Sequence, residues 1–211
     1  MTNKLFIEGS LGAYLEALAG RTMVPGGGSA AAVSAALGTG LNLMVIAYSL
    51  RQDTSSVVQE RLLSLKKEQD ESLILLEKYI DEDCIAFRSL MRALSEKRDA
   101  QAEYIAAAEV PFNICRECCR SISAGAYLAV NSNRNLITDV GCAAQMLKAA
   151  FYSAKLNVEI NLKYISSRPV EKTEMINNLV LWKKNIEGSL AEITGRVNAA
   201  LTMEKKNGKD C

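Results

Sequence analysis

Apolar residues recur along this chain mostly at steps of three and four positions, the spacing that buries one face of a helix. The alternating β-branched residues typical of strands are nearly absent. The spacing therefore predicts an all-α fold, a single-domain bundle of about six helices over residues 1–205 with a long central buried helix and a frayed tail at 206–211. The expected helices cover residues 3–19, 28–50, 56–95, 98–130, 139–166 and 171–203.

Polar residues and prolines mark the expected helix ends. Caps are expected from Asp53, Thr54 or Ser55 at the third helix and from Thr138 or Asp139 at the fifth. Pro169 should stop the fifth helix. Pro111 lies inside the fourth expected helix and should kink or interrupt it.

The segment from Thr22 to Leu50 contains no charged residue. It is long enough to cross a bilayer, which takes about 20 apolar residues. Its glycines and scattered hydroxyl and amide side chains instead favour a soluble helix buried on every side, in the bundle or in a subunit interface. Ala32, Ala36 and Gly40 recur every four positions, a spacing that lets a neighbouring helix approach closely. A membrane-associated protein is the less favoured alternative.

The same segment begins with three glycines. "GGGSAA" (26–31) matches the loose G-x-G-x-x-A form of a dinucleotide loop, but no convincing strand precedes it and no acidic residue follows at the required distance. No Gly-Lys-Ser/Thr follows either, which excludes a Walker loop. Two interpretations remain. Backbone N–H groups at the positive end of a helix bind an anion or an electron-rich ring edge, or the glycines form a tight turn into the core.

Composition narrows the function further. The 25 basic and 24 acidic residues nearly cancel, which argues against a nucleic-acid binder. The amino terminus has no apolar export signal, so we expect a cytoplasmic protein whose six cysteines are free thiols. The chain contains no histidine, which excludes Ser-His-Asp, Cys-His and His-zinc sites. Acid–base chemistry near neutral pH then falls to a carboxyl, lysine, cysteine or tyrosine with a shifted pKa, or to water.

Asp83 is the most informative candidate for such chemistry. It falls on the apolar face of its helix between Ile80 and Phe87, where a carboxylate is costly unless it is paired or used. Burial would raise its pKa toward neutrality. A buried ion pair or an exposed position at a helix irregularity would explain it equally well. In "CRECC" (115–119) three cysteines share an apolar face, and core packing is favoured over a metal site because a fourth ligand is missing.

A second polar cluster follows at 131–139. Helix capping by itself explains Asp139, but the asparagines of "NSNRN" exceed what a cap requires. Asn157 and Asn161 lie further along the same expected helix, on the face of Ala150 and Ala154.

Four stretches in this order resemble the formiminotransferase-cyclodeaminase / methenyltetrahydrofolate cyclohydrolase family. They are "VPGGGSAAAVSAALG" (24–38), "DCIAF" (83–87), "AAEVPF" (107–112) and "NSNRNLITDVGCAAQMLKAAFYSAKLNVEINLKYI" (131–165). Their order and spacing agree over nearly the whole chain. Many family members carry a Lys-Leu-Pro-Lys-like segment where this chain has "RALSEKRDAQ" (92–101), without a proline.

The resemblance implies an all-helical homodimer with a folate site in a groove and no partner among nucleic acids or membranes. It implies one of two reactions: opening of 5,10-methenyltetrahydrofolate by water to 10-formyltetrahydrofolate, or closure of 5-formiminotetrahydrofolate with release of ammonia. We expect the cyclohydrolase, because no fused formiminotransferase is present; the cyclodeaminase and a non-catalytic folate-binding or assembly protein are the alternatives. No metal or nicotinamide is required beyond the folate substrate.

The residues in the matching stretches receive roles on this basis. Asp83 and Asp139 are the catalytic candidates, and Asp83 is preferred as the base that accepts a proton from water. The expected substrate-binding residues are Gly26, Gly27, Gly28, Ser29, Asn133 and Asn135. The asparagines would bind pterin or formyl oxygen, and the glycine segment would hold pterin edges or the glutamate tail through backbone N–H groups.

Overall fold

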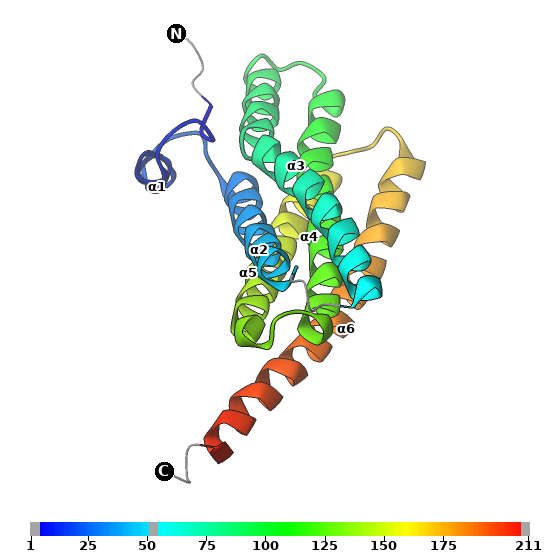
Figure 1. Ribbon diagram of the computed structural model, residues 1–211. Coiled ribbons are helices and arrows are strands. Elements are labelled where there is room, and N and C mark those ends of the chain that lie inside the picture. Colours follow the sequence, from blue (N-terminus) through cyan, green and yellow to red (C-terminus); the bar gives the residue numbers. More distant parts are fainter. Residues whose placement is uncertain (1–4, 51–54, 208–211) are drawn as a thin grey trace.

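The computed structural model describes residues 5–50 and 55–207, and every regular element within them is helical (Figure 1). The elements are α1 (Leu11–Ala19), α2 (Gly27–Ser49), α3 (Ser56–Ser95), α4 (Gln101–Asn131), the 3₁₀ turn η1 (Arg134–Leu136), α5 (Ile137–Leu162) and α6 (Pro169–Asn207). The predicted six-helix, all-α fold is therefore confirmed. Helix α6 continues two residues into the segment expected to fray.

Helices α2 and α4 pack against each other and each also packs against α3 and α5, and α6 packs along α4 and α5. Figure 1 shows α1 standing beside the bundle near the start of α2, and the last turns of α6 extending past the other helices. The core is made of side chains from all the long helices, including Ile46, Leu62, Ile114, Phe151 and Ile193. Burial of these apolar stripes is what holds the helices together.

Within one chain the bundle does not bury helix α2 on every side, so its expected full burial requires a subunit interface. Ala35 and Ile46 are fully buried, whereas Leu37 and Tyr48 on the outer side are 56% and 63% exposed. Three neighbouring helices cover only part of its circumference, so one uncharged face remains open in the single chain. Length and composition alone would let α2 cross a membrane, but the core helix of a soluble protein passes the same test, and 44% of its most apolar window is buried.

The close helix approach occurs at a different glycine from the expected one. A Cβ on Gly40 would meet no atom within 4 Å, whereas a Cβ on Gly38 would lie 2.7 Å from Leu147 Cγ and 3.0 Å from the carbonyl oxygen of Ala143. Gly38 therefore lets α2 and α5 pack tightly. Gly38 lies two residues, about 200° around the helix, from both Ala36 and Gly40, so the close contact with α5 is on nearly the opposite side of α2.

Three expected helix starts and ends are wrong. Helix α1 begins at Leu11 rather than at residue 3, because Ser10 Oγ accepts the N–H of Ala13 and caps it there. Helix α5 begins at Ile137 directly after η1, which places Thr138 and Asp139 inside its first turn rather than at its cap. It ends at Leu162, before residue 166.

Pro169 acts differently from the prediction, and Pro111 does not interrupt its helix. Pro169 does not stop α5; it is the first residue of α6, where its missing N–H costs no hydrogen bond. Pro111 lies inside α4, which runs without interruption from Gln101 to Asn131. Of the candidates at the start of α3, Ser55 occupies the N-cap without a side-chain capping bond, and Asp53 and Thr54 lie outside the described residues.

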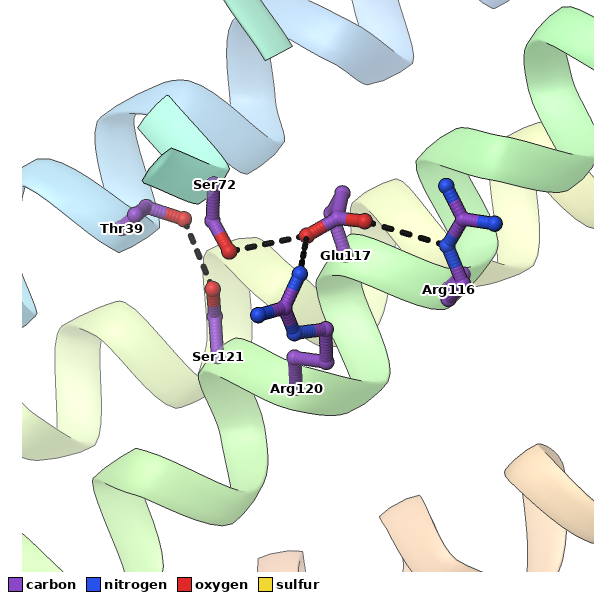
Figure 2. Close-up of polar contacts among 6 residues, drawn as sticks. All are labelled: Thr39, Ser72, Arg116, Glu117, Arg120 and Ser121. Carbon is purple, nitrogen blue, oxygen red and sulfur yellow. Dashed lines mark hydrogen bonds and ion pairs between the residues drawn. The ribbon is translucent and has the colours of Figure 1, made fainter. Parts of the chain in front are cut away.

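A buried polar network joins α2, α3 and α4 (Figure 2). Glu117 is fully buried and accepts hydrogen bonds from Ser72 Oγ at 2.8 Å, Arg120 at 3.1 Å and Arg116 at 3.2 Å. In a second group beside it, the hydroxyls of Thr39 on α2 and Ser121 on α4 lie 3.0 Å apart (Figure 2). Both arginines reach solvent, so the carboxylate is neutralised from the surface while its hydrogen bonds are satisfied inside.

The same network explains the polar residues within otherwise apolar helices. Asn42 on α2 donates to Gln69 Oε1 and to the carbonyl oxygen of Ser121, and all three residues are buried. Cys115 and Cys118, close to Glu117 in the sequence, are fully buried in the core, as the packing interpretation of "CRECC" predicts. Burial raises the pKa of both thiols, which makes them poor nucleophiles.

Candidate functional site

A small cavity of about 160 Å³ lies where the start of α2 meets α3, α4 and α5. It is lined by Met23, Val24, Gly26, Gly27, Gly28, Asp83, Phe87, Ala107, Asn157 and Asn161. A larger groove of about 560 Å³ along α1, α2 and α3 is almost entirely apolar. The smaller cavity is the better functional candidate, because several polar groups converge in it.

Asp83 approaches this cavity from α3 and meets the start of α2. Its Oδ2 accepts the backbone N–H of Ser29 at 2.9 Å. The first residues of a helix have N–H groups without partners inside the helix, and Gly26 at the N-cap has no side chain to satisfy them. The Asp83 carboxylate takes the place of the missing cap, at the positive end of the helix dipole.

The surroundings of Asp83 change its acidity. Burial raises its pKa from 3.8 to about 6, against the opposing effect of the Ser29 N–H. Desolvation penalises the charged carboxylate more than the hydrogen bond stabilises it. At pH 7 the group is mostly ionised yet still basic enough to accept a proton, which suits a general base.

Two of the three glycines are explained by how closely Asp83 and Asn157 approach them, whereas a Cβ on Gly26 would meet no atom within 4 Å. A Cβ on Gly28 would lie 2.0 Å from Asp83 Oδ1, and a Cβ on Gly27 would lie 3.3 Å from Asn157 Nδ2. None of the three glycines has a positive φ. Space for these two side chains, rather than an unusual backbone conformation, is what requires the absence of a Cβ.

Ser29 positions Asp83 without lining the cavity itself. Its side chain is fully buried, and its Oγ lies 3.1 Å from the hydroxyl of Tyr14 on α1. Its backbone N–H holds Asp83, so Ser29 positions the carboxylate and its side chain does not line the cavity. Burial raises the pKa of the neighbouring Cys84 thiol to about 11, so this thiol is no competing base near neutral pH.

Asn157 and Asn161 complete the polar lining from α5. They are four residues apart, so both point to the same side of the helix. Asn161 Nδ2 donates to the carbonyl oxygens of Ala107 and Asn157, both at 2.9 Å, and Asn157 Nδ2 donates to Ser153 at 2.9 Å. Neither asparagine is among the site residues expected from sequence. Their four-residue spacing on a helix face of small residues is the sequence signal that could have identified them as site residues.

The other expected site residues lie elsewhere in the chain. Asp139 precedes Asn157 by 18 positions on α5, about 27 Å along a helix that rises 1.5 Å per residue. Asn133 donates its N–H to Ser49 Oγ at the far end of α2, and its side chain caps η1 by accepting the N–H of Asn135. Within one chain the structure therefore does not bring Asp139, Asn133 and Asn135 to the cavity of Asp83.

The segment that departs from the family pattern also lies away from the cavity. It joins the end of α3 to α4, and Lys97 within it has a φ of 54°. Arg98 pairs with Glu96 and Glu103. None of these residues lines the cavity.

Comparison with known proteins gives a consistent result. The family model described as Formiminotransferase-cyclodeaminase matches residues 10–180. The chain is 30% identical over 190 residues to a methenyltetrahydrofolate cyclohydrolase of Methylorubrum extorquens, covering 85% of this chain and 88% of the relative. It is 31% identical over 195 residues to the formimidoyltransferase-cyclodeaminase of Gallus gallus, covering 84% of this chain but 35% of the relative.

The fold comparison agrees. The crystal structure of a formiminotetrahydrofolate cyclodeaminase from Thermotoga maritima superposes with a TM-score of 0.85 at 26% identity, covering 91% of this chain and 97% of that one. This chain spans about a third of the bifunctional Gallus gallus relative. The match over residues 10–180 contains the glycine run, Asp83 and both cavity asparagines. The chain belongs to the formiminotransferase-cyclodeaminase family, whose members named here are folate one-carbon enzymes.

Proposed function

We propose that this protein is a methenyltetrahydrofolate cyclohydrolase, which opens 5,10-methenyltetrahydrofolate with water to 10-formyltetrahydrofolate. The observation that supports this most directly is Asp83, a desolvated carboxylate with a pKa near 6 in a cavity that no cationic side chain lines within residues 5–50 and 55–207. A carboxylate without a cationic partner is suited to a substrate cation, and the methenyl bridge between N5 and N10 is a cation.

The ionised Asp83 acts as the base. It accepts a proton from a water molecule while the water oxygen forms a bond to the methenyl carbon. The carboxylate's negative charge and the substrate's positive charge are both neutralised in this step, so Asp83 assists it by taking the proton, while its charge helps to hold the cationic substrate in place. The hydroxyl on the former methenyl carbon then loses its proton as the C–N5 bond breaks, N5 gains a proton, and the formyl group stays on N10. One proton is released in the net reaction.

Cyclodeamination is the second candidate, favoured by the similarity to the Thermotoga maritima cyclodeaminase. In this reaction N10 attacks the formimino carbon, and the C–N bond to the departing ammonia breaks. Protonated Asp83 would supply the proton that ammonia needs in order to leave. A pKa near 6 lets one carboxyl serve as base in the first reaction and acid in the second.

The protein acts as a homodimer in this proposal. The cavity of about 160 Å³ is smaller than the 300–1,000 Å³ of typical small-molecule sites, so one chain holds only part of a folate. The open face of α2 is uncharged and suits a second copy. A two-fold, antiparallel pairing about the middle of α2 would bring the far end of one α2 to the glycine corner of the other. Asp139, Asn133 and Asn135 would then reach the site from the second copy.

Three measurements test these proposals. Loss of the near-ultraviolet absorbance of methenyltetrahydrofolate reports cyclohydrolase turnover, and ammonia release from formiminotetrahydrofolate reports the deaminase. A wild-type protein that accelerates neither reaction refutes the enzymatic proposal.

The third measurement tests whether the site is shared between two subunits. Inactive Asp83→Asn and Asp139→Asn variants are mixed and allowed to exchange subunits. Recovered activity supports a site built from two copies, and continued inactivity of a verified mixed dimer rejects it.

A further inference from the structure

Tyr14 joins α1 to the first turn of α2. It is the residue that α1 buries in the bundle, and its hydroxyl lies 3.1 Å from Ser29 Oγ. Ser29 is fully buried as well, so each hydroxyl supplies the hydrogen-bond partner that water cannot supply there. The two residues are 15 positions apart, and the bond between them closes the intervening chain into a loop.

The loop closed in this way contains one wall of the cavity. Met23, Val24 and the three glycines line the cavity, and all of them lie between Tyr14 and Ser29 in the chain. Where the loop ends, the backbone N–H of Ser29 donates to Asp83 at 2.9 Å. The position of Ser29 therefore determines both the length of this hydrogen bond and the place where the cavity wall ends.

The segment before α1 is attached to α3 close to the same carboxylate. The N–H groups of Phe6 and Ile7 donate to the carboxylate of Asp81 at 2.7 and 3.2 Å. The ring of Phe6 meets the ring of Tyr14 edge to face, with 5.7 Å between their centroids. Asp81 precedes Asp83 by two residues on α3, so these contacts fix Tyr14 relative to the helix that carries the proposed base.

We propose that Tyr14 is a positioning residue for the reaction at Asp83: its hydroxyl holds Ser29, so that the Ser29 N–H stays on the carboxylate and the cavity wall stays in place. Tyr14 acts through Ser29, because it lines the apolar groove along α1, α2 and α3 and not the cavity. Burial raises the pKa of Tyr14, so its hydroxyl stays protonated near neutral pH. This inference rests on the proposed role of Asp83 as the base and adds the residue that aligns it.

Two variants each remove one half of the bond. Tyr14→Phe removes the hydroxyl and keeps the buried ring, and Ser29→Ala keeps the backbone N–H that holds Asp83. Because the two hydroxyls act through each other, the double variant should lose no more activity than the more affected single variant. A double variant whose loss is the product of the two single losses would overturn the inference. Tyr152→Phe is the matched control, since it removes a hydroxyl that donates to Glu187, and neither residue lines the cavity.

The first measurement is the pH dependence of kcat/KM for loss of methenyltetrahydrofolate. A displaced Ser29 N–H stabilises the ionised carboxylate less, so the pKa of Asp83 should rise above about 6 in both variants. The acidic limb of the profile should move upward by about 0.3–1 pH unit, and kcat/KM at pH 8 should fall about 3- to 10-fold. Tyr152→Phe should change neither value. The other ionisable groups near this pair, Asp81 and Cys84 on α3, are the same in all these proteins.

The second measurement needs no substrate. The carboxyl carbon of Asp83 is labelled with ¹³C, assigned with the Asp83→Asn variant, and followed by NMR as the pH is lowered from 8 to 4. Its chemical shift reports the protonation of Asp83 directly. A titration midpoint at higher pH in Tyr14→Phe supports the inference, and a midpoint equal to that of the wild type overturns it.

The outcomes separate this inference from the proposed function. A Tyr14→Phe protein with a lower Tm but with wild-type kcat/KM and an unchanged acidic limb would show a structural role alone and overturn the inference. Should Tyr14→Phe fail to fold, Ser29→Ala decides by the same two measurements. A wild type without turnover rejects the proposed function, and the NMR titration still tests whether Tyr14 positions Asp83. An active wild type whose variants leave the titration of Asp83 unchanged rejects the positioning role and leaves the proposed function intact.

Discussion

Replacing Gly28 by alanine tests the close packing at the start of α2. The new Cβ would lie 2.0 Å from Oδ1, 2.5 Å from Cγ and 2.8 Å from Oδ2 of Asp83, far inside van der Waals contact. The carboxylate would have to leave its position, and its hydrogen bond from the Ser29 N–H would break or lengthen. Because Gly28 has no positive φ, backbone strain adds nothing to this effect.

The size of the effect follows from three contributions. Overpacking costs about 1–3 kcal/mol. Losing the hydrogen bond to a charged group costs about 1.5–3 kcal/mol when the displaced carboxylate stays buried. Alanine returns up to about 1 kcal/mol through its higher helix propensity. The free energy of unfolding should therefore fall by about 2–5 kcal/mol, which lowers Tm by roughly 5–15 °C for a chain of this size. Displacing the base should lower turnover at least about 100-fold.

Thermal unfolding and the methenyltetrahydrofolate absorbance assay measure the two effects. Gly27→Ala is a graded comparison, since its Cβ would lie 3.3 Å from Asn157 Nδ2, and Gly188→Ala on α6 is the control, with nothing within 4 Å. The losses should rank Gly28 above Gly27, and Gly188→Ala should be neutral or stabilising by up to about 1 kcal/mol. A Gly28→Ala protein with wild-type Tm and turnover would refute the contact with Asp83.

The remaining predictions concern carboxylates. Turnover of methenyltetrahydrofolate should fall about tenfold per pH unit below about 6, as Asp83 becomes protonated; a flat kcat/KM profile from pH 7 to 5 would contradict its role as base. Asp83→Asn should lower turnover about 100- to 10,000-fold. The same variant should raise the free energy of unfolding at pH 8 by about 1–3 kcal/mol, because a raised pKa means that the ionised carboxylate destabilises the folded state. This gain should shrink as the pH falls through 6 toward 4, which denaturant titrations at pH 8 and 4.5 would detect. Asp81 accepts the N–H groups of Phe6 and Ile7, so Asp81→Ala should speed hydrogen exchange of those two amides; unchanged protection would show that other contacts hold the segment. Glu117→Ala should destabilise the protein by about 3–5 kcal/mol in denaturant titrations, with Glu117→Gln costing less, because the alanine leaves Ser72 without its acceptor in the core.

The elements predicted from sequence depended on local signals of different strength. The long helices α3 and α4 were recognisable because their apolar positions repeat over many turns. Their ends were harder to predict, since a cap depends on one side-chain bond. Ser10 caps α1, so this helix begins several residues after the predicted start. Asn133 caps the 3₁₀ turn η1, which leads directly into α5, where Thr138 or Asp139 was expected to be the cap.

Asp83 and the glycine run could be singled out as candidate site residues because each is unusual for its place in the chain. A carboxylate on an apolar face and three glycines at a helix start both need a tertiary explanation. Asn157 and Asn161 were harder to assign, because asparagines on a helix face are compatible with solvent. Asp139 was grouped with Asp83 because both are carboxylates. Asp139 lies at the start of α5, whereas the part of α5 that lines the cavity of Asp83 is near its end, so the two are far apart within one chain.

The amino-acid sequence by itself determined that this chain is helical, which faces of its helices are apolar, and that an acidic residue interrupts one of those faces. Helical periodicity is a property of residues a few positions apart, so it can be read directly from the chain. Only the tertiary structure decided that Asp83 meets the N–H of Ser29, 54 positions away, and that Asn157 lies against Gly27. Those contacts depend on how α2, α3 and α5 cross, and that geometry comes from packing all the apolar faces together at once.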